Sequence, residues 1–356
     1  MPGTALDGSG VMTSAAIRMP RLAARPIRLV AGSLLLAGMV GGVTQFTASA
    51  AGAAVRAPAT FSVSGRLSDV VATSDTNAWA VGSTGSSSST KTLILHWNGT
   101  AWKQVASPSP AGSAGLSSVA ATSPTNAWAI GSAGNNKTLI LHWNGTTWKQ
   151  VPSPGPPPSY LTSVAATSAS NAWAVGYTGT GTLVLHWNGK TWKRVSSPTP
   201  GLETSPVPST GGTLIGVGTV SAATAWAVGT TGDCGCGNGD SLILRWNGTA
   251  WKQVPSPTPA GGRKAGAALK SVAATSTNNA WAVGVSGCGC MPSSSWPFIL
   301  RWNGTAWKQV PSAIQSVNTS LSAVAATSES NAWAVGTTGT GKTLIEHWNG
   351  TAWKLS

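Results

Sequence analysis

Ionisable side chains are scarce in this sequence. Only 8% of its 356 residues are charged, and it contains 8 Asp plus Glu, 4 His and 2 Tyr. A glycoside hydrolase needs paired carboxylates, and other hydrolases need a nucleophile beside a base. No serine lies in a G-x-S-x-G motif. We therefore predict a protein with no catalytic residues and no cofactor.

Long helical patterns are also lacking after residue 55. The chain instead holds 44 Gly, 22 Pro and 19 Trp. Disordered chains are poor in aromatic residues, so this many Trp indicates a packed core. Frequent Gly, Pro, Ser and Thr are typical of turns between short strands. The composition therefore predicts an all-β fold.

An apolar run from Leu29 to Val43 follows a basic segment and precedes the small residues Ala48-Ser49-Ala50. This order is typical of a secretory signal peptide with an A-x-A cleavage site. The run is short and broken by Gly, which disfavours a membrane-spanning helix. We predict a signal peptide over residues 1–50 with cleavage near Ala50, a linker over residues 51–60, and a secreted protein. An uncleaved membrane anchor is the alternative.

One sequence unit recurs six times after residue 60, and such repeats decide the fold. Each unit begins with Leu, carries a Trp twelve residues later in A-W-A-V-G or a close variant, and ends in W-N-G-x-x-W. The leading residues are Leu67, Leu116, Leu161, Leu214, Leu269 and Leu321. The repeat accounts for every Trp except Trp296.

Each unit contains four strand-like runs, and Asn-Gly, a strong hairpin signal, joins the third to the fourth. Four antiparallel strands per unit are typical of a propeller blade. We predict a six-bladed β-propeller over residues 61–356. Its blades span about 61–110, 111–158, 159–203, 204–259, 260–316 and 317–356. The ring closes either by apposition of blades six and one, or by a strand from Thr60–Val63 added to the last blade.

The order A-W-A-V-G, Gly-rich loop, strand and N-G-x-x-W resembles bacterial propellers related to the photosystem II stability factor. That group lies within the Asp-box (bacterial neuraminidase repeat) superfamily, and the resemblance covers about residues 61–356. The Asp-box sequence Ser-x-Asp-x-Gly-x-Thr-Trp is replaced here by W-N-G-T-A-W. The resemblance therefore implies a blade-forming relative. A degenerate sialidase-like hydrolase is a minor alternative.

The same turns are similar to the W-D-G-x-G-W turns of small fucose-binding propeller lectins. That family places Glu and Arg around its sugar. Its approximate Glu position corresponds here to Leu in four units and Phe in one, with Glu only at Glu346. A fucose pocket is therefore not implied, although a carbohydrate-binding propeller remains the alternative function.

Variation between units is confined to the second-to-third-strand loops and the linkers between units. Both lie on one face of an up-and-down blade, and such insertions mark binding faces. The longest occur around blades four and five. We predict the binding site there, with Trp296, Asp233, Asp240, Arg263 and Lys264 as candidate binding residues. The structural alternatives are a Trp296 ring packed over its loop base and turn roles for the two Asp.

The two loops of blades four and five also hold all 4 cysteines, in two C-G-C sequences. Cysteines in an exported chain favour disulfides, and bridges between the loops are easier than closure of a tight C-x-C ring. Four thiolates would also suit zinc, but C-x-C is a weaker zinc signal than C-x-x-C. We predict disulfides, and no metal site, among Cys234, Cys236, Cys288 and Cys290.

The formal charge of +14 is distributed, with one Lys on each fourth strand. Edge lysines discourage pairing between sheets, and this spread differs from the clustered charge of nucleic-acid-binding proteins. One His precedes the second Trp in four units, and Arg245 and Arg301 replace it in the others. We interpret these as surface or inter-blade polar positions and the N-G-T sequons as turns. The histidines are His96, His142, His186 and His347.

These observations favour binding over catalysis. We predict a monomeric, non-enzymatic binding or scaffold protein, free of membrane after signal cleavage. Its expected partner is another protein or a cell-envelope polymer, because a basic exterior attracts anionic surfaces. Nucleic acid is disfavoured.

Overall fold

The computed structural model describes residues 62–356 except 87–88, 201–210, 233–238, 260–265 and 289–294. Within the chain, Pro58–Ser356 forms one compact unit. The described residues form strands, turns and loops, and they contain no helix of the length and apolarity that crossing a bilayer requires.

The unit is a six-bladed β-propeller, as the repeat predicts. Each blade is a four-stranded antiparallel sheet whose strands pair in chain order. Blades one and two comprise β1 (Arg66–Ser74), β2 (Asn77–Thr84), β3 (Lys91–Trp97), β4 (Trp102–Gln104), β5 (Gly115–Ser123), β6 (Asn126–Ala133), β7 (Lys137–Trp143) and β8 (Trp148–Val151). Blades three and four comprise β9 (Ser159–Ser168), β10 (Asn171–Thr178), β11 (Gly181–Trp187), β12 (Trp192–Arg194), β13 (Thr213–Ser221), β14 (Thr224–Thr230), β15 (Ser241–Trp246) and β16 (Trp251–Gln253). Blades five and six comprise β17 (Gly266–Ser276), β18 (Asn279–Cys288), β19 (Trp296–Trp302), β20 (Trp307–Gln309), β21 (Ser320–Ser328), β22 (Asn331–Thr337), β23 (Thr343–Trp348) and β24 (Trp353–Leu355).

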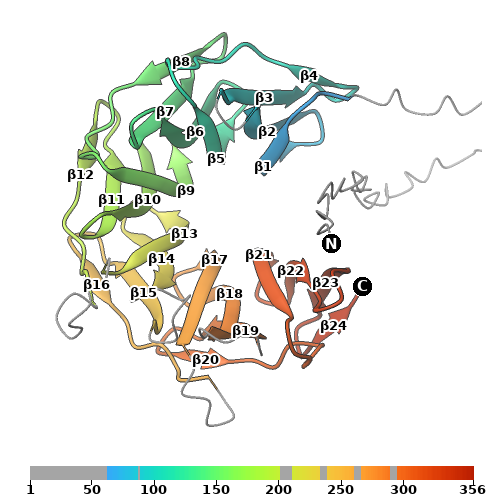
Figure 1. Ribbon diagram of the computed structural model, residues 1–356. Coiled ribbons are helices and arrows are strands. Elements are labelled where there is room, and N and C mark those ends of the chain that lie inside the picture. The colour runs from blue at the N-terminus through green and yellow to red at the C-terminus, as the bar shows by residue number, and fades with distance from the viewer. Residues whose placement is uncertain (1–61, 87–88, 201–210, 233–238, 260–265, 289–294) are drawn as a thin grey trace, which may run out of the picture. The chain divides into compact units, whose positions relative to one another are not determined.

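The first strand of each blade lies innermost and the fourth outermost (Figure 1). The inner strands β1, β5, β9, β13, β17 and β21 pack against one another in that order. The repeat Lys of each outer strand is exposed, which confirms the edge lysines expected from the sequence.

The hydrophobic core is divided among the junctions between consecutive blades. Trp79 of blade one, for example, is fully buried against Trp143 and Trp148 of blade two, with ring centroids 4.9 and 5.2 Å apart. The second contact is edge-to-face, a favoured arrangement for aromatic pairs. The same trio recurs at the next four junctions, centred on Trp128, Trp173, Trp226 and Trp281. The repeat Trp residues therefore build the core.

The invariant Gly after A-W-A-V is required by the approach of the first strand. At Gly131, a Cβ would lie 2.0 Å from the carbonyl oxygen of Gly115. The strand pairing shifts register beside this position, between Leu116 and Ser118, as expected at a β-bulge. All six blades share this contact, so a side chain is excluded here for steric reasons.

The Asn-Gly turns are stabilised by the Asn side chain. Oδ1 of Asn144 accepts hydrogen bonds from the Thr146 N–H and hydroxyl and from the Thr147 N–H, at 2.9–3.1 Å. Gly145 has φ of 96°, a conformation that favours glycine. The N-G-T pattern is therefore explained by turn geometry, as the sequence indicates.

The repeat histidines stack on the second-strand Trp of their own blade; those of the first three blades lie between blades, and His347 lies beside the exposed Trp333. His142 lies 4.1 Å from Trp128, and its Nε2–H donates to Asn126 Oδ1 at 2.9 Å. Asn126 Nδ2 donates in turn to Thr122 Oγ1, which orients its amide. Burial lowers the pKa of His96, His142 and His186. The inter-blade interpretation of these residues is confirmed.

Arginines occupy the same position in blades four and five. Arg245 Cζ lies 5.2 Å from the Trp226 ring and 5.4 Å from the Trp302 ring of the next blade. Arg301 lies comparably over Trp281 and Trp348. A cation over an aromatic face is attracted to it, so His and Arg both fill the gap between the Trp rings.

Neither expected mode of ring closure is seen among the described residues. The last sheet contains β21, β22, β23 and β24, with no further strand among the described residues. Val63 packs on blade one, against Leu93, Leu95 and Trp102, and Thr60 lies outside the described residues. No packing of the extent seen between other inner strands joins β21 to β1 in this part of the chain.

Candidate functional site on the variable-loop face

The second-to-third-strand loops and the linkers lie on one face of the propeller. Backbone hydrogen bonds join a linker to a loop in several blades, as between the Ala114 N–H and the Thr90 carbonyl at 2.9 Å. The Ser159 N–H donates likewise to the Asn136 carbonyl at 3.0 Å. We call this surface the variable-loop face.

Many of the residues predicted for this site fall outside the described residues. They are the candidate binding residues Asp233, Arg263 and Lys264, and the predicted disulfide cysteines Cys234, Cys236 and Cys290. Cys288 is the last residue of β18, and its side chain is not among those described. The disulfides and the binding roles of these residues stay predictions.

Asp240 lies at the end of the blade-four loop and is exposed. Its N–H donates to Thr231 Oγ1 at 2.9 Å, and its carbonyl accepts from the Thr231 N–H at 2.8 Å. These bonds close the base of the loop through the Asp240 backbone. The backbone of Asp240 thus continues the pairing of β14 with β15, and the turn and binding roles of its side chain stay predictions.

Trp296 begins β19 and pairs with Ser286 of β18. The expectation that it lies within the loop was wrong, because W-P-F-I-L-R-W continues as one strand. Its side chain is half-buried. Side chains two residues apart share a strand face, so Trp296 lies on the side of β19 that carries Phe298. Phe298 packs against Trp226 and Val228 of blade four.

A second aromatic group on this face was not foreseen. Tyr160 and Tyr177, the 2 Tyr of the chain, pair across β9 and β10 and stack with centroids 5.1 Å apart at 27°. Both are half-buried. Burial is the larger cause that raises the pKa of Tyr177, and the neighbouring Tyr160 hydroxyl raises it further. Tyr177 is therefore neutral at physiological pH, and the stack presents apolar ring surface with polar tips.

The Tyr pair and Trp296 flank blade four from opposite sides. Tyr177 is two residues from Val175, which packs with Leu214 and Val217 of blade four, so Tyr177 lies on that side of blade three. Trp296 lies on the blade-four side of blade five, as shown above. The loop that Thr231 and Asp240 close belongs to blade four. Aromatic groups thus lie on both sides of blade four.

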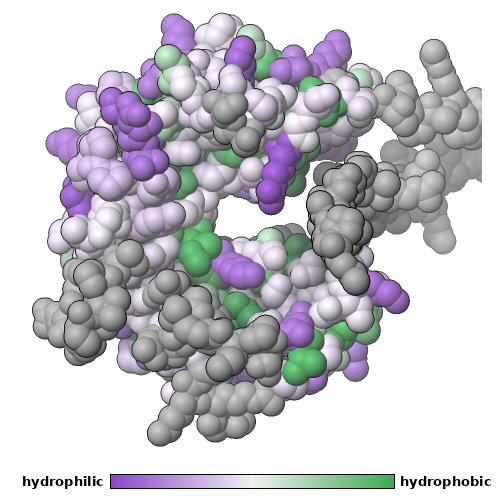
Figure 2. Space-filling model, in the orientation of Figure 1, coloured by the Kyte–Doolittle hydropathy of each residue, from purple (hydrophilic) through white to green (hydrophobic). Residues whose placement is uncertain are grey.

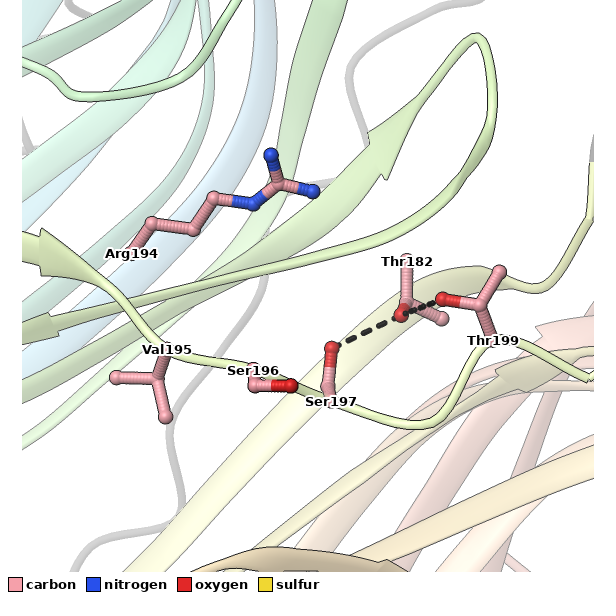
Figure 3. Close-up of a pocket in the computed structure, with 6 residues that line it drawn as sticks. All are labelled: Thr182, Arg194, Val195, Ser196, Ser197 and Thr199. Carbon is pink, nitrogen blue, oxygen red and sulfur yellow. Dashed lines mark hydrogen bonds between the residues drawn. The ribbon is translucent and has the colours of Figure 1, made fainter.

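A shallow hollow of about 330 Å³ lies nearby, at the outer part of blade three. Figure 3 shows Thr182 between Ser197 and Thr199, with hydroxyl oxygens 2.9 Å apart in each pair, and Arg194 extended along the rim. The Thr182–Ser197 contact recurs as Thr92–Ser107 and Thr138–Ser153. The hydroxyl contact therefore anchors the linker to its blade in these three blades. Arg194 takes the place of the Gln found at this position in blades one, two, four and five.

Near the axis, Asp69 links blades one and two. Its Oδ2 accepts from the Ser118 hydroxyl at 2.8 Å and the Val119 N–H at 2.9 Å. Burial raises the pKa of Asp69, while these bonds lower it. Ser118 plays the corresponding role toward Val164 of blade three. A buried carboxyl with a raised pKa is a candidate acid in general, but the bonds of this one join blades.

Glu346 is fully buried between blades five and six. Its Oε1 accepts from the Ser312 hydroxyl at 2.5 Å, and its Oε2 has no hydrogen-bond partner among the described residues. The strand register puts Leu at this position in the other five blades, so the Phe expected in one of them was wrong; Phe298 pairs two residues earlier. A side chain sealed in a junction is unsuited to hold a sugar.

Charged and metal-binding groups are dispersed. Figure 2 shows hydrophilic residues at several separate places on the face in view. No three His, Cys, Asp or Glu side chains come together as metal ligands in the part of the chain that the structure describes. The arrangement offers aromatic and polar contacts on a rigid scaffold.

No family model matches the chain, and no curated protein matches it. Solved structures share its fold. YCF48 bound to D1 peptide is 15% identical with a TM-score of 0.54, over 82% of this chain and 81% of that one. The SapL1 lectin in complex with alpha methyl fucoside is 10% identical with a TM-score of 0.51, over 83% and 96%. Virginiamycin B lyase from Staphylococcus aureus is 13% identical with a TM-score of 0.50, over 79% and 84%.

These likenesses establish a shared propeller fold. The likeness to YCF48 agrees in fold with the resemblance drawn from the repeat. Propellers of this shape include a peptide-bound protein, a lectin and a lyase, and function resides in sites placed on a fold.

Proposed function

We propose that this protein is a secreted, non-enzymatic binding propeller that holds a protein ligand, as an exposed peptide segment, on the variable-loop face around blade four. One observation carries the proposal. Most repeat Trp residues lie in the five blade junctions, whereas the irregular aromatic residues Tyr160, Tyr177 and Trp296 lie on this face. Tyr and Trp are enriched where proteins bind each other, because they combine apolar area with a hydrogen-bonding tip.

A protein ligand is supported over a catalytic role by the placement of the acids. Asp69 and Glu346 bond between blades, and Asp240 is exposed at a loop base. The other described acids, Asp75 and Glu329, lie at exposed turns. The peptide-bound YCF48 structure shows that a propeller of similar fold accommodates such a ligand.

A selection from a random peptide library displayed on phage tests the proposal, with the propeller as bait. We expect peptides that bind the native protein and bind Tyr160→Ala/Tyr177→Ala at least about tenfold more weakly, the loss typical of interface aromatics. Lys193→Ala, on the outer strand of the same blade, is the control and should bind normally. Peptides that bind all three proteins equally would place the site elsewhere.

A carbohydrate ligand is the second candidate, since a half-buried Trp and a Tyr stack also suit sugar rings. A glycan array run on the same proteins separates the two. Sugar binding that Trp296→Ala abolishes, with no peptide recovered from the library, would replace the protein ligand by a carbohydrate.

A further inference from the structure

Five junctions between consecutive blades share one aromatic geometry. The second-strand Trp of each of the first five blades lies 4.8–4.9 Å from the third-strand Trp of the next blade. It lies 5.1–5.2 Å from the fourth-strand Trp of that blade. All five second-strand Trp are 0% exposed. In five junctions, therefore, the third- and fourth-strand Trp of the next blade cover this side of a blade.

Blade six presents the same side without a cover. Trp333 is 39% exposed, although it stacks on His347 at 4.2 Å as its counterparts do on their histidines. Val335 and Ile345 are 41% and 42% exposed, and the equivalent Val81 and Ile94 are 0% exposed. We call this surface the blade-six face.

Blade one presents the complementary side, also uncovered. Leu67 and Val70 are 50% and 53% exposed, whereas the equivalent Leu116 and Val119 are 3% and 5% exposed. Trp97 and Trp102 already lie 5.9 Å apart, the spacing of Trp143 and Trp148 in a formed junction. We call this surface the blade-one face.

The polar residues beside these faces also match. In the fifth junction, Arg301 Nη2 donates to the Glu329 carbonyl, at the turn before β22. The equivalent residues of a sixth junction are His347 and Asp75. The Asp75 carbonyl accepts from Trp97 Nε1, as the Glu329 carbonyl does from Trp348 Nε1, so the blade-one face presents the same carbonyl to a partner.

We propose that the blade-six face of one molecule packs on the blade-one face of a second copy, forming a sixth junction between chains. The five junction geometries agree to within 0.1 Å. Closure within one chain would have to alter all five close-packed junctions together. Another copy offers the required face without that change. Exposed apolar patches mark such interaction sites. In this proposal the protein self-associates, whereas the sequence predicts a monomer.

Because the two faces differ, the contact is head-to-tail, and its assembly can be dissected. Trp333→Asp removes the blade-six face and Leu67→Asp removes the blade-one face. Both side chains are already exposed, so the folded monomer should survive either change. Leu355→Asp is the control, since Leu355 is 59% exposed and lies on the side of β24 that carries Trp353, toward blade five.

Sedimentation velocity over a concentration series, with the fold checked by circular dichroism, gives the result. The native protein and Leu355→Asp should associate with increasing concentration. Either face variant alone should dissociate at roughly 30-fold higher concentration, and an equimolar mixture of the two should form 1:1 dimers and nothing larger. Association that persists in both variants would overturn the proposal. A native protein that stays monomeric at every concentration would also overturn it. Shielding of Trp333 from acrylamide quenching in that monomer would indicate closure within the chain.

Discussion

At the scale of single residues, the polar positions of the repeat are explained by contacts within and between blades. His142 stacks on Trp128 and bonds to Asn126, and Arg245 fills the same gap as a cation. Asn144 closes its turn through one carbonyl oxygen. None of these groups is available for chemistry, which narrows the functional search to residues that break the pattern.

The buried histidines make stability depend on pH. Burial lowers the pKa of His96, His142 and His186 below the ordinary value of 6.5, so the unfolded chain takes up protons first as the pH falls. Their stabilising contribution is full above pH 6.5 and is lost as the pH falls through the folded pKa values. We expect the melting temperature to drop between pH 7.5 and pH 5.

The variant His96→Arg/His142→Arg/His186→Arg, which copies blades four and five, is the test of that cause. Its melting temperature, followed by circular dichroism, should fall less over the same pH range. An equal fall in the native protein and the variant would assign the pH dependence to other groups.

At the scale of strands, the close approach of the first two strands in each blade is the strictest constraint. Gly131→Ala would bring a Cβ to 2.0 Å from a backbone oxygen, so we expect a loss of about 1–3 kcal/mol in unfolding free energy. Gly115→Ala, on the paired strand, meets nothing closer than 3.5 Å and should change stability by less than about 0.5 kcal/mol. Urea titration measures both, and equal losses would refute the steric explanation.

The strands were predictable because their signals are local and repeated. The spacing from Leu116 to Trp128 and the Asn144-Gly145 turn specify the pairing of four strands in every unit. Trp296 was predicted to lie in the loop because the insertion around Cys288 made that loop look longer. The alternation of Phe298 and Leu300 in fact extends the strand back to Trp296. The pairing of Tyr160 with Tyr177 could have been predicted from the sequence. Tyr160 directly precedes Leu161 and Tyr177 directly follows Gly176, and those two residues pair in every blade.

At the scale of the whole molecule, curvature was not predictable from the sequence. Each unit specifies its own sheet and its contacts with the next blade, so the six repeats look equivalent in the sequence. The angle at which blades meet depends on how rings such as Trp79, Trp143 and Trp148 fit together, which no spacing records. The exposed Trp333 and Leu67 therefore became visible only in three dimensions.

The junctions also predict which Trp residues hold the molecule together. Trp173→Ala should cost about 3–5 kcal/mol, since it empties a fully buried site. Trp333→Ala, measured at a concentration where the protein is monomeric, should cost less than about 2 kcal/mol, because part of its ring is already in water. Denaturant titrations of both variants decide the matter, and equal costs would mean that Trp333 is covered within its own chain.

Because five hydrophobic clusters each join two consecutive blades, the propeller behaves energetically as a linear array, in which each unit is stabilised by its nearest neighbours. The two end blades each lack one neighbour, so their amide hydrogens should exchange with solvent before those of the middle blades. The same property has an evolutionary consequence. Unequal recombination between the repeated gene segments can add or delete a whole blade while leaving every remaining contact intact, so the number of blades can change more readily than the blade itself.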